Sequence, residues 1–409
     1  MSARAAPDGM RWAAAASRLG DTAAAAAEVA EALAAGLGEG PVDLVLAFFS
    51  AHHVVAAEPL AQALRGRLEP GCLAGASGHG VVTSEHEFEG EPALSVIAAR
   101  LPQVALAPFV LVSEGWDEAL GDAGAFARMA PGAEGAELVL VLGDPFSLDL
   151  AGLFRAFERH APGVRLVGGL ASALPRPGSN ALLLNDWVAG GGGVAVALSG
   201  ALRADVVVSQ GCRAIGPPLT VTRGEGNVIA ELDGGPAIER VEQVLLEVAE
   251  AEAERLQHGL YVGLPVRPDA AGRGDYLIRA LLGGDRTRGL LAVGDRVAVG
   301  QQVRLHVRDA GTAREDLEML LSPQAFDTPA RAALLFACNG RGRGLYGAAD
   351  GDIAPLQAAL GGGVPVAGMF CAGEIGPVGK RNFLHGQTAS IAILRPGTPA
   401  GSPPEGRPH

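Results

Sequence analysis

The run Ala332-Ala-Leu-Leu-Phe336 decides the fold of this chain, because it is continuously apolar and leads into the polar, glycine-rich stretch Cys338-Asn-Gly-Arg-Gly342. Leu138-Val-Leu-Val-Leu142 is a second run of the same kind. A strand whose residues are all apolar is covered on both faces, as in sheets that lie between helices. The sequence therefore predicts an α/β fold with its sheets flanked by helices.

Three segments of the chain share one order of strand, helix, glycine-rich turn and strand. The first residue and the turn glycine of each segment are Asp43 with Gly75, Glu137 with Gly169, and Ala332 with Gly368. The spacing is 32 residues in the first two segments and 36 in the third. This regularity predicts two domains with mixed sheets, built from repeated β-α-β units. The alternative is that strands and helices alternate in any α/β protein.

The chain between the second and third units has a different pattern. Leu219 to Leu232 alternates polar and apolar residues around Gly224-Glu-Gly226, which predicts a hairpin. Pro236 suits the first turn of a helix that we expect to run through Glu254. Further strands are expected at Tyr276 to Leu282, Gly289 to Val293 and Gln302 to Arg308. We expect domains at residues 8–234 and 235–395, and a disordered Pro-, Gly- and Ser-rich tail at residues 396–409.

Composition excludes several classes of partner. The net charge of −13 argues against nucleic acid, whose binding needs Lys and Arg to neutralise phosphates. No run approaches the ~20 apolar residues that span a membrane, and the Ala-rich stretch from Arg11 to Glu31 predicts an amphipathic helix rather than a signal peptide. The four cysteines are widely spaced, so neither a disulfide framework nor a metal site is indicated. We expect a cytoplasmic protein without a cofactor.

Several motifs of this chain resemble those of FIST proteins. Cys338-Asn-Gly-Arg-Gly342, Ala372-Gly-Glu-Ile-Gly-Pro377 and Asn382-Phe-Leu-His-Gly386 are similar to the C-terminal half of the family. Asp43-Leu-Val-Leu-Ala-Phe-Phe-Ser50 and Gly75-Ala-Ser-Gly-His-Gly80 are similar to its N-terminal domain. The resemblance covers nearly the whole chain, so the expected domains are FIST N-like and FIST C-like. It implies a bacterial sensory module that binds a small ligand, such as an amino acid, in signal transduction. No output domain is visible, so we expect a separate signalling protein as partner.

The candidate ligand-binding residues lie where the motifs follow apolar strands, at loops that commonly carry function. They are Cys338, Asn339, Gly340, Arg341, Gly342, Cys371, Gly373, Glu374, Asn382 and His385. A second lining of the pocket is possible at Ser77 and His79, with Glu85 and Glu87 following on the same segment. The ordinary interpretation of that second set is polar groups on exposed loops.

Arg341 and Glu374 carry the chemistry of the ligand hypothesis. Arg341 would clamp a ligand carboxylate with two parallel hydrogen bonds, while Glu374 would meet an ammonium group, and an amino acid presents both. The alternative is that Arg341 and Glu374 neutralise each other and hold two loops together.

Catalysis is the main alternative to binding. Cys338 or Cys371, with His385 and Glu374, supply a thiol, a base and an orienting acid for a hydrolase or transferase. Cysteine in a buried strand is more commonly a small hydrophobe. We therefore expect a protein that is not an enzyme. A ligand-free protein-interaction scaffold is the third possibility.

Overall fold

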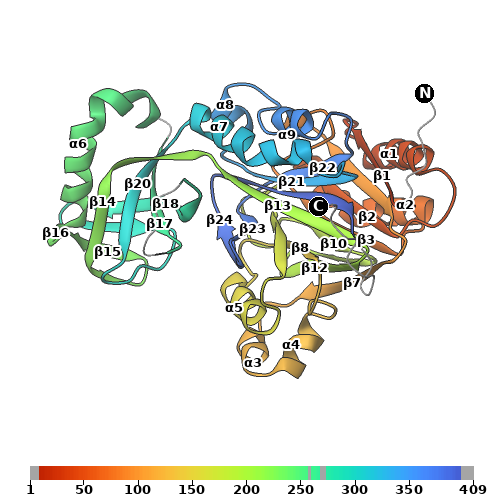
Figure 1. Cartoon of the computed structure of the whole chain (residues 1–409), viewed down its shortest axis with the longest axis horizontal. Helices are drawn as coiled ribbons and strands as arrows, with labels where there is room; N and C mark the ends of the chain where they lie inside the picture. Colours follow the sequence, from red (N-terminus) through yellow and green to blue (C-terminus); the bar gives the residue numbers. More distant parts are fainter. Residues whose placement is uncertain (1–8, 257–258, 268–272, 398–409) are drawn as a thin grey trace, which may run out of the picture.

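The computed structural model describes residues 9–256, 259–267 and 273–397. It shows a body of three six-stranded sheets and a separate lobe built on a seven-stranded sheet (Figure 1). The predicted α/β class with mixed sheets and flanking helices is confirmed. Most of the tail predicted at residues 396–409 lies outside the described residues, and Pro396 ends the last strand.

The three sheets of the body repeat one topology. In spatial order the first sheet contains β1 (Arg11–Ser17), β6 (Leu94–Arg100), β2 (Leu44–Phe49), β3 (Cys72–Ser77), β10 (Leu182–Leu184) and β11 (Trp187–Ala189). The second contains β7 (Val104–Leu111), β12 (Gly193–Gly200), β8 (Leu138–Gly143), β9 (Arg165–Leu170), β23 (Glu374–Val378) and β24 (Arg381–His385). The third contains β13 (Leu202–Gln210), β25 (Thr388–Pro396), β21 (Ala332–Cys338), β22 (Val366–Cys371), β4 (Gly80–Val82) and β5 (Glu87–Glu89). In each sheet the third and fourth strands pair in parallel and all other neighbours are antiparallel.

The last two strands of each sheet form a hairpin that belongs, in the sequence, to another of the three β-α-β units. The hairpin that follows β3 joins the third sheet, the one that follows β9 joins the first, and the one that follows β22 joins the second. The three units predicted from the sequence are therefore linked by a cyclic exchange of hairpins. As a result, the motif hairpin β23–β24 of the C-terminal part lies on a sheet made of N-terminal strands.

Three equivalent glycines let the parallel strands approach closely. Gly75, Gly168 and Gly368 lie opposite Ala47, Val141 and Leu335. A Cβ atom on these glycines would stand 2.3, 1.9 and 1.8 Å from the carbonyl oxygens of those partners. No side chain fits at such distances, so glycine is required at this position of each unit.

The cores follow the sheets. The inner faces of the three sheets share one apolar core, which includes Phe48, Leu142 and Phe336. Helices cover each outer face and form a separate core with it. The first sheet carries α1 (Thr22–Leu37), η1 (Ala51–Ala56) and α2 (Ala57–Leu68); the second carries α3 (Trp116–Gly121), α4 (Ala123–Met129) and α5 (Leu150–His160); the third carries α7 (Ala310–Leu321), η3 (Ser322–Phe326), α8 (Gly342–Tyr346) and α9 (Ile353–Ala359).

The sequence predicted one amphipathic helix for the Ala-rich N-terminal stretch, and this prediction is wrong for its first half. Arg11–Ser17 is strand β1, and the helix begins only at Thr22, where the Asp21 side chain accepts a hydrogen bond from the Ala24 N–H (2.7 Å). Pairing with β6 outweighs the high helix propensity of alanine in the first half.

The lobe is inserted in the third unit between β13 and α7. Its strands are β14 (Cys212–Glu225), β20 (Gln302–Arg308), β17 (Leu260–Pro265), β18 (Tyr276–Asp285), β19 (Leu290–Val293), β15 (Val228–Leu232) and β16 (Gly235–Pro236), with α6 (Ala237–Leu256) and η2 (Arg273–Asp275). β14 also pairs with β15, which closes the sheet around a core of its own.

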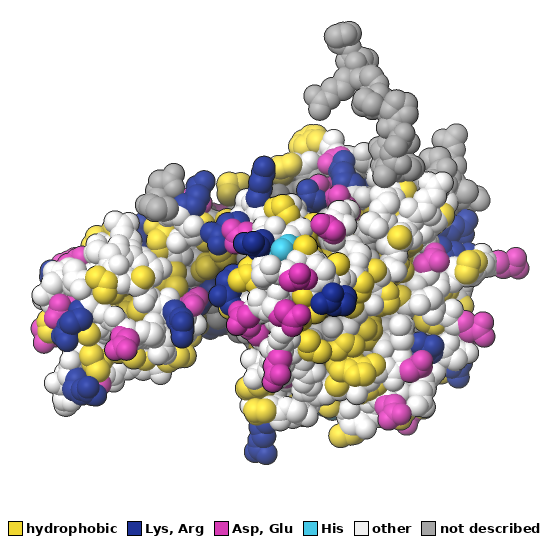
Figure 2. Space-filling model, turned by 90° about the horizontal axis from the view of Figure 1, so that it is seen from below, with side chains coloured by type: hydrophobic (Ala, Val, Ile, Leu, Met, Phe, Trp, Pro, Cys, Tyr) yellow, Lys and Arg dark blue, Asp and Glu magenta, His cyan; other side chains and the backbone are white. Residues whose placement is uncertain are grey.

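The predicted hairpin around Gly224-Glu-Gly226 is the β14–β15 hairpin. The expected boundary between residues 234 and 235 falls inside this lobe. Figure 2 shows the surface hollowed between lobe and body.

Candidate functional site

The two cysteine motifs end neighbouring parallel strands. Cys338 of β21 lies directly opposite Cys371 of β22, and strand alternation turns both side chains toward the inner core. Glu374 begins β23 three residues after Cys371. The structure thus brings Cys338, Cys371 and Glu374 together at the ends of these strands.

Arg341 is held by residues that the sequence analysis did not select. Its side chain is fully buried, and its Nε and Nη2 atoms donate to Asp352 Oδ2 (2.8 Å) and Oδ1 (2.6 Å). Nη2 also donates to the Tyr346 hydroxyl (2.7 Å). Asp352 therefore occupies the Nε–Nη2 edge of the guanidinium, which would otherwise be free to clamp a ligand carboxylate. The hydrogen-bonded partner of Arg341 is Asp352 rather than Glu374. The remaining nitrogen, Nη1, has no partner among the described residues.

Glu374 is the second fully buried ionisable side chain of the site. Its Oε2 accepts hydrogen bonds from the Thr388 hydroxyl (2.8 Å) and N–H (3.2 Å), whereas Oε1 has no partner within the described part of the chain. Burial raises the pKa of Glu374 to about 8, although the bonds from Thr388, the charge of Arg341 and the nearby Cys338 thiol act in the opposite direction. A substantial fraction of this carboxyl is thus protonated at neutral pH.

The two thiols lie in an environment that opposes ionisation. Burial, and then the nearby charge of Glu374, raise the pKa of Cys338 and of Cys371 well above the ordinary value. A nucleophilic cysteine needs a lowered thiol pKa instead. The surroundings of Cys338 and Cys371 therefore do not favour the thiolate that a cysteine-dependent hydrolase or transferase would need.

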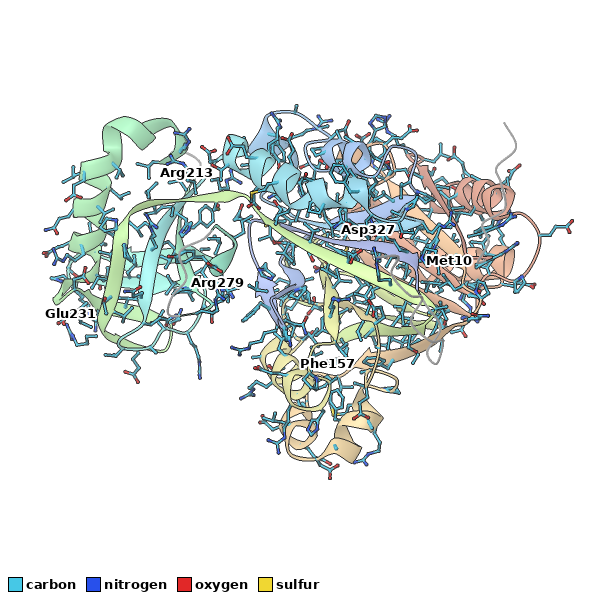
Figure 3. The ribbon with its side chains drawn as sticks, in the orientation of Figure 1. Met10, Phe157, Arg213, Glu231, Arg279 and Asp327 are labelled. Carbon is cyan, nitrogen blue, oxygen red and sulfur yellow. The ribbon has the colours of Figure 1, made fainter. Side chains whose placement is uncertain are left out.

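Several candidate residues hold the fold. Asn382 donates to Val164 O and accepts from Leu166 N, each at 2.9 Å, which fixes the motif hairpin to the second sheet. His385 lies opposite Glu374 in the β23–β24 register and bonds through Nε2 with Gly376 O (3.0 Å). Burial lowers the pKa of His385 to about 4, and the charge of Arg279 adds to this effect. Figure 3 shows Arg279 on the side of the lobe that faces this hairpin.

The glycines and the second lining take other positions. Gly340 packs under the Gln387 side chain, Gly373 against Leu384, and Gly342 against Glu89, while Asn339 is exposed. The buried Ser77 hydroxyl accepts from the Ala181 N–H (2.9 Å). The exposed His79 is held through its backbone N–H, which donates to the Ser172 hydroxyl oxygen (2.8 Å). Ser77 and His79 are thus not joined to Arg341 and Glu374 by a hydrogen bond in the described structure.

Glu87 connects the exchanged hairpin β4–β5 to the arginine site. Its Oε1 accepts from the N–H groups of Asp352 (2.9 Å) and Ile353 (2.8 Å), and its buried Oε2 is unpartnered within the described residues. Burial and the charge of Asp352 raise its pKa to about 8. The sequence offered one signal for Asp352, the acidic stretch Asp350-Gly-Asp352 that follows the arginine motif. It offered none for the meeting of residues 87 and 352.

Within the described residues, no three His, Cys, Asp or Glu side chains are grouped so as to hold a metal ion. In the same part of the chain, no helix combines the length and the apolar character needed to cross a membrane.

The FIST N domain matches residues 43–235 and the FIST C domain matches residues 237–377. The chain therefore belongs to the FIST family, whose domains are sensory domains of signal transduction. An uncharacterised protein of Mycobacterium tuberculosis is 39% identical over 378 residues, which are 91% of this chain and 97% of the relative. An uncharacterised protein of Mycobacterium bovis is 38% identical over 87% of this chain and 91% of its own length.

Cyanuric acid hydrolase from A. caulinodans aligns with 95% of this chain and 100% of its own, at 10% identity and a TM-score of 0.37. At this score the likeness carries no functional information.

Proposed function

We propose that this protein is a cytoplasmic sensor that binds a small polar ligand, an amino acid or a related metabolite, and relays its occupancy to a partner protein. The observation that carries the proposal is a pair of unpartnered polar atoms: Arg341 Nη1 and Glu374 Oε1 belong to fully buried side chains and have no hydrogen-bond partner among the described residues. An unpaired buried polar atom costs about 1–3 kcal/mol, so such atoms in a native site need an explanation. A ligand that pairs with both atoms supplies one.

The two atoms are complementary to a zwitterion. A ligand carboxylate accepts from Arg341 Nη1, and a ligand ammonium donates to Glu374 Oε1. The carboxylate meets one nitrogen rather than the fork, because Asp352 holds the other edge of the guanidinium. The ion pair with Asp352 fixes the guanidinium in place, which lowers the entropy lost on binding.

Entry to this site requires movement of a covering loop, since both charged side chains are fully buried. The Gln387 side chain lies over Gly340, and Gln387 has a φ of 60°, a conformation that a residue with a Cβ rarely adopts. This residue separates the β23–β24 hairpin from β25, so a ligand that displaces it changes the junction of two sheets. Such a change is a physical route from occupancy to a partner.

The proposal is tested by a thermal-shift screen of the purified protein against the amino acids and common carboxylate metabolites. A ligand at a hundred times its dissociation constant stabilises the folded state by about 2.7 kcal/mol, enough for a shift of a few degrees. We expect Glu374→Gln to abolish the shift. The half-exposed Glu158, which pairs with Arg381, gives the matched control Glu158→Gln. If no compound shifts the wild-type protein, the sensor proposal fails and the scaffold alternative is tested by partner capture.

A further inference from the structure

The lobe is joined to the body by two adjacent single-residue links. Gly211 separates β13 from β14, and Asp309 separates β20 from α7. The Asp309 N–H donates to Gly211 O (3.2 Å), so the two links lie side by side. Both crossings of the chain between body and lobe therefore pass through one point, which has the form of a hinge.

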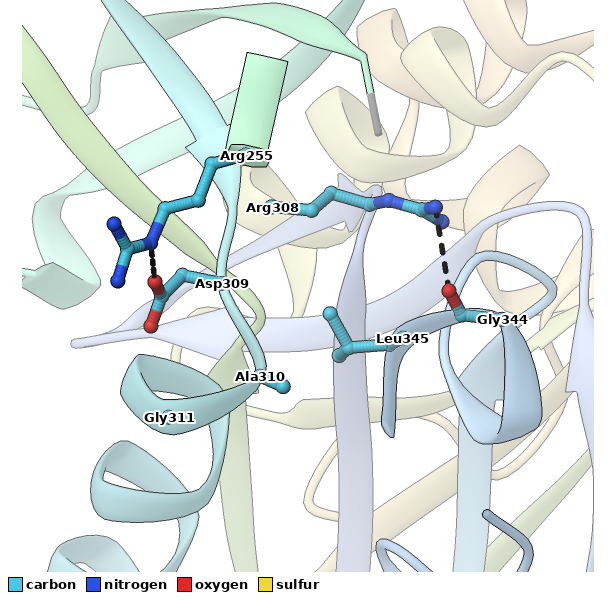
Figure 4. A pocket seen from close by; sticks show the side chains of 7 residues that line it. All are labelled: Arg255, Arg308, Asp309, Ala310, Gly311, Gly344 and Leu345. Carbon is cyan, nitrogen blue, oxygen red and sulfur yellow. Dashed lines mark hydrogen bonds and ion pairs between the residues drawn. The ribbon is translucent and has the colours of Figure 1, made fainter. Parts of the chain in front are cut away.

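A pocket of about 250 Å³ opens at this hinge (Figure 4). Its lining residues are Arg255, Arg308, Asp309, Ala310, Gly311, Gly344 and Leu345. Arg255 and Arg308 come from the lobe, Ala310 and Gly311 from the start of α7, and Gly344 and Leu345 from α8, which follows the arginine motif. A molecule bound in this hinge pocket would touch the lobe, the hinge and the body together.

The charges of the hinge pocket favour an anion, although the protein has a net charge of −13. Among its lining residues are two guanidinium groups and one carboxylate, Asp309. Asp309 pairs with Arg255 and caps α7 by accepting from the Thr312 N–H (2.6 Å). Arg308 donates to Gly340 O (2.8 Å) and Gly344 O (3.4 Å), and its buried Nε has no partner within the described chain.

We propose that the hinge pocket binds the oxyanion group of a small metabolite, a carboxylate or a phosphate, and that its occupancy restrains the lobe against the body. Guanidinium groups recognise both oxyanions through paired hydrogen bonds. The volume suits a small acid and is below the 300 Å³ at which pockets for drug-sized ligands begin. The inference goes beyond the proposed function, because the pocket does not include Arg341 or Glu374.

Binding is measured by calorimetric titration of the full-length protein with inorganic phosphate and, in a second arm, with succinate. We expect saturable binding in at least one arm, and the arm that binds identifies the oxyanion. Arg255→Gln should weaken that binding at least about tenfold, since it removes one charged donor. Arg286→Gln is the control, because Arg286 is an arginine of the same lobe, 81% exposed and paired with Glu242. Arg308→Gln also removes the bonds to the 340–344 loop, so Arg255→Gln is the decisive variant.

Movement of the lobe is measured with spin labels on Asp117→Cys in the body and Arg286→Cys in the lobe. The four natural cysteines are buried, so the labels react at the introduced positions. Saturation with the bound oxyanion should narrow the distribution of distances between the labels. Glu374→Gln should leave this response unchanged, which separates the hinge pocket from the amino-acid site.

Three outcomes overturn the inference. They are the absence of saturable binding in both arms, equal affinity of Arg255→Gln and wild type, and a label distribution that is the same with and without the bound oxyanion.

Discussion

Arg341 and Asp352 form a bidentate ion pair in which neither side chain is exposed to solvent. Glu87 holds the backbone of Asp352 in place, because its carboxyl oxygen Oε1 accepts a hydrogen bond from the Asp352 N–H. The arginine of the family motif is thus anchored by an aspartate from its own unit and, through it, by a hairpin lent from the N-terminal unit. This anchoring leaves a single nitrogen of Arg341 for a ligand.

Asp352→Asn should destabilise the protein by about 3–5 kcal/mol, because it leaves the Arg341 charge buried without a counterion. The free energy of unfolding in urea measures this effect. Asp117→Asn is the matched control, since Asp117 is 91% exposed and pairs with Arg155 at the surface. The control should lie within about 0.5 kcal/mol of wild type. An equally small effect of Asp352→Asn would contradict the buried pair.

Gly168→Ala should be strongly destabilising or prevent folding, because the new Cβ would stand 1.9 Å from the carbonyl oxygen of Val141. Gly66→Ala in α2 is the control, since its Cβ would meet nothing within 4 Å. The control should stabilise the helix by about 0.5–1 kcal/mol. Thermal unfolding of the two variants distinguishes these results, and a neutral Gly168→Ala would disprove the close strand approach.

The stability of the ligand-free protein should fall between pH 6.5 and 8. Glu87 and Glu374 keep their protons up to a pKa of about 8 in the folded state, whereas the unfolded chain loses them near pH 4.5. The folded state then binds more protons, so stability decreases with rising pH, by at most about 1.4 kcal/mol per pH unit for each group. His306 and His385 have the opposite effect below pH 6.5. Their pKa values are lowered to about 4 in the folded state, so the unfolded chain binds more protons there and their contribution to stability rises with pH.

Urea unfolding at half-unit steps from pH 6 to 8.5 measures this dependence. Glu374→Gln should reduce the slope between pH 6.5 and 8 by removing one of the two groups. A wild-type stability that rises through this window would contradict the burial of the two carboxyl groups.

The native cysteines should react slowly with iodoacetamide at pH 7. Burial raises the pKa of all four thiols, to about 12 at Cys72 and Cys212 and well above the ordinary value at Cys338 and Cys371. Mass spectrometry of the native and urea-unfolded protein gives the labelling rate at each position. Rapid native labelling at Cys338 would instead support the cysteine-dependent enzyme.

The sequence predicts the parts of the fold that depend on local pattern. β8 and β21 are continuous apolar runs because both faces of their sheets are covered. The exchange of hairpins could not be predicted, since β4 and β5 have three residues each and β4 pairs with β22, which is far away in the sequence. Strand β1 was missed because the alanine run expresses a helix propensity that tertiary pairing overrides.

The candidate site was predictable in part. The register of β21 and β22 follows from the repeated unit, and it brings Cys338 and Cys371 together. The partner of Arg341 was not predictable, because any carboxylate can satisfy a guanidinium and only the path of the loop after Gly342 selects Asp352. Asn382 and His385 belong to the same motifs, yet their hydrogen bonds serve the motif hairpin itself.

The most direct test of the central claim is calorimetric titration of wild type and Glu374→Gln with the amino acid found by the screen. The titration is run at pH 7.5 in two buffers of different ionisation enthalpy. If the ligand ammonium meets Glu374, binding to wild type releases a fraction of a proton, because the carboxyl has a pKa of about 8 and must ionise. The account predicts this release, and a loss of affinity of at least about tenfold in Glu374→Gln. Equal affinity of the two proteins, with no proton released from wild type, would contradict it.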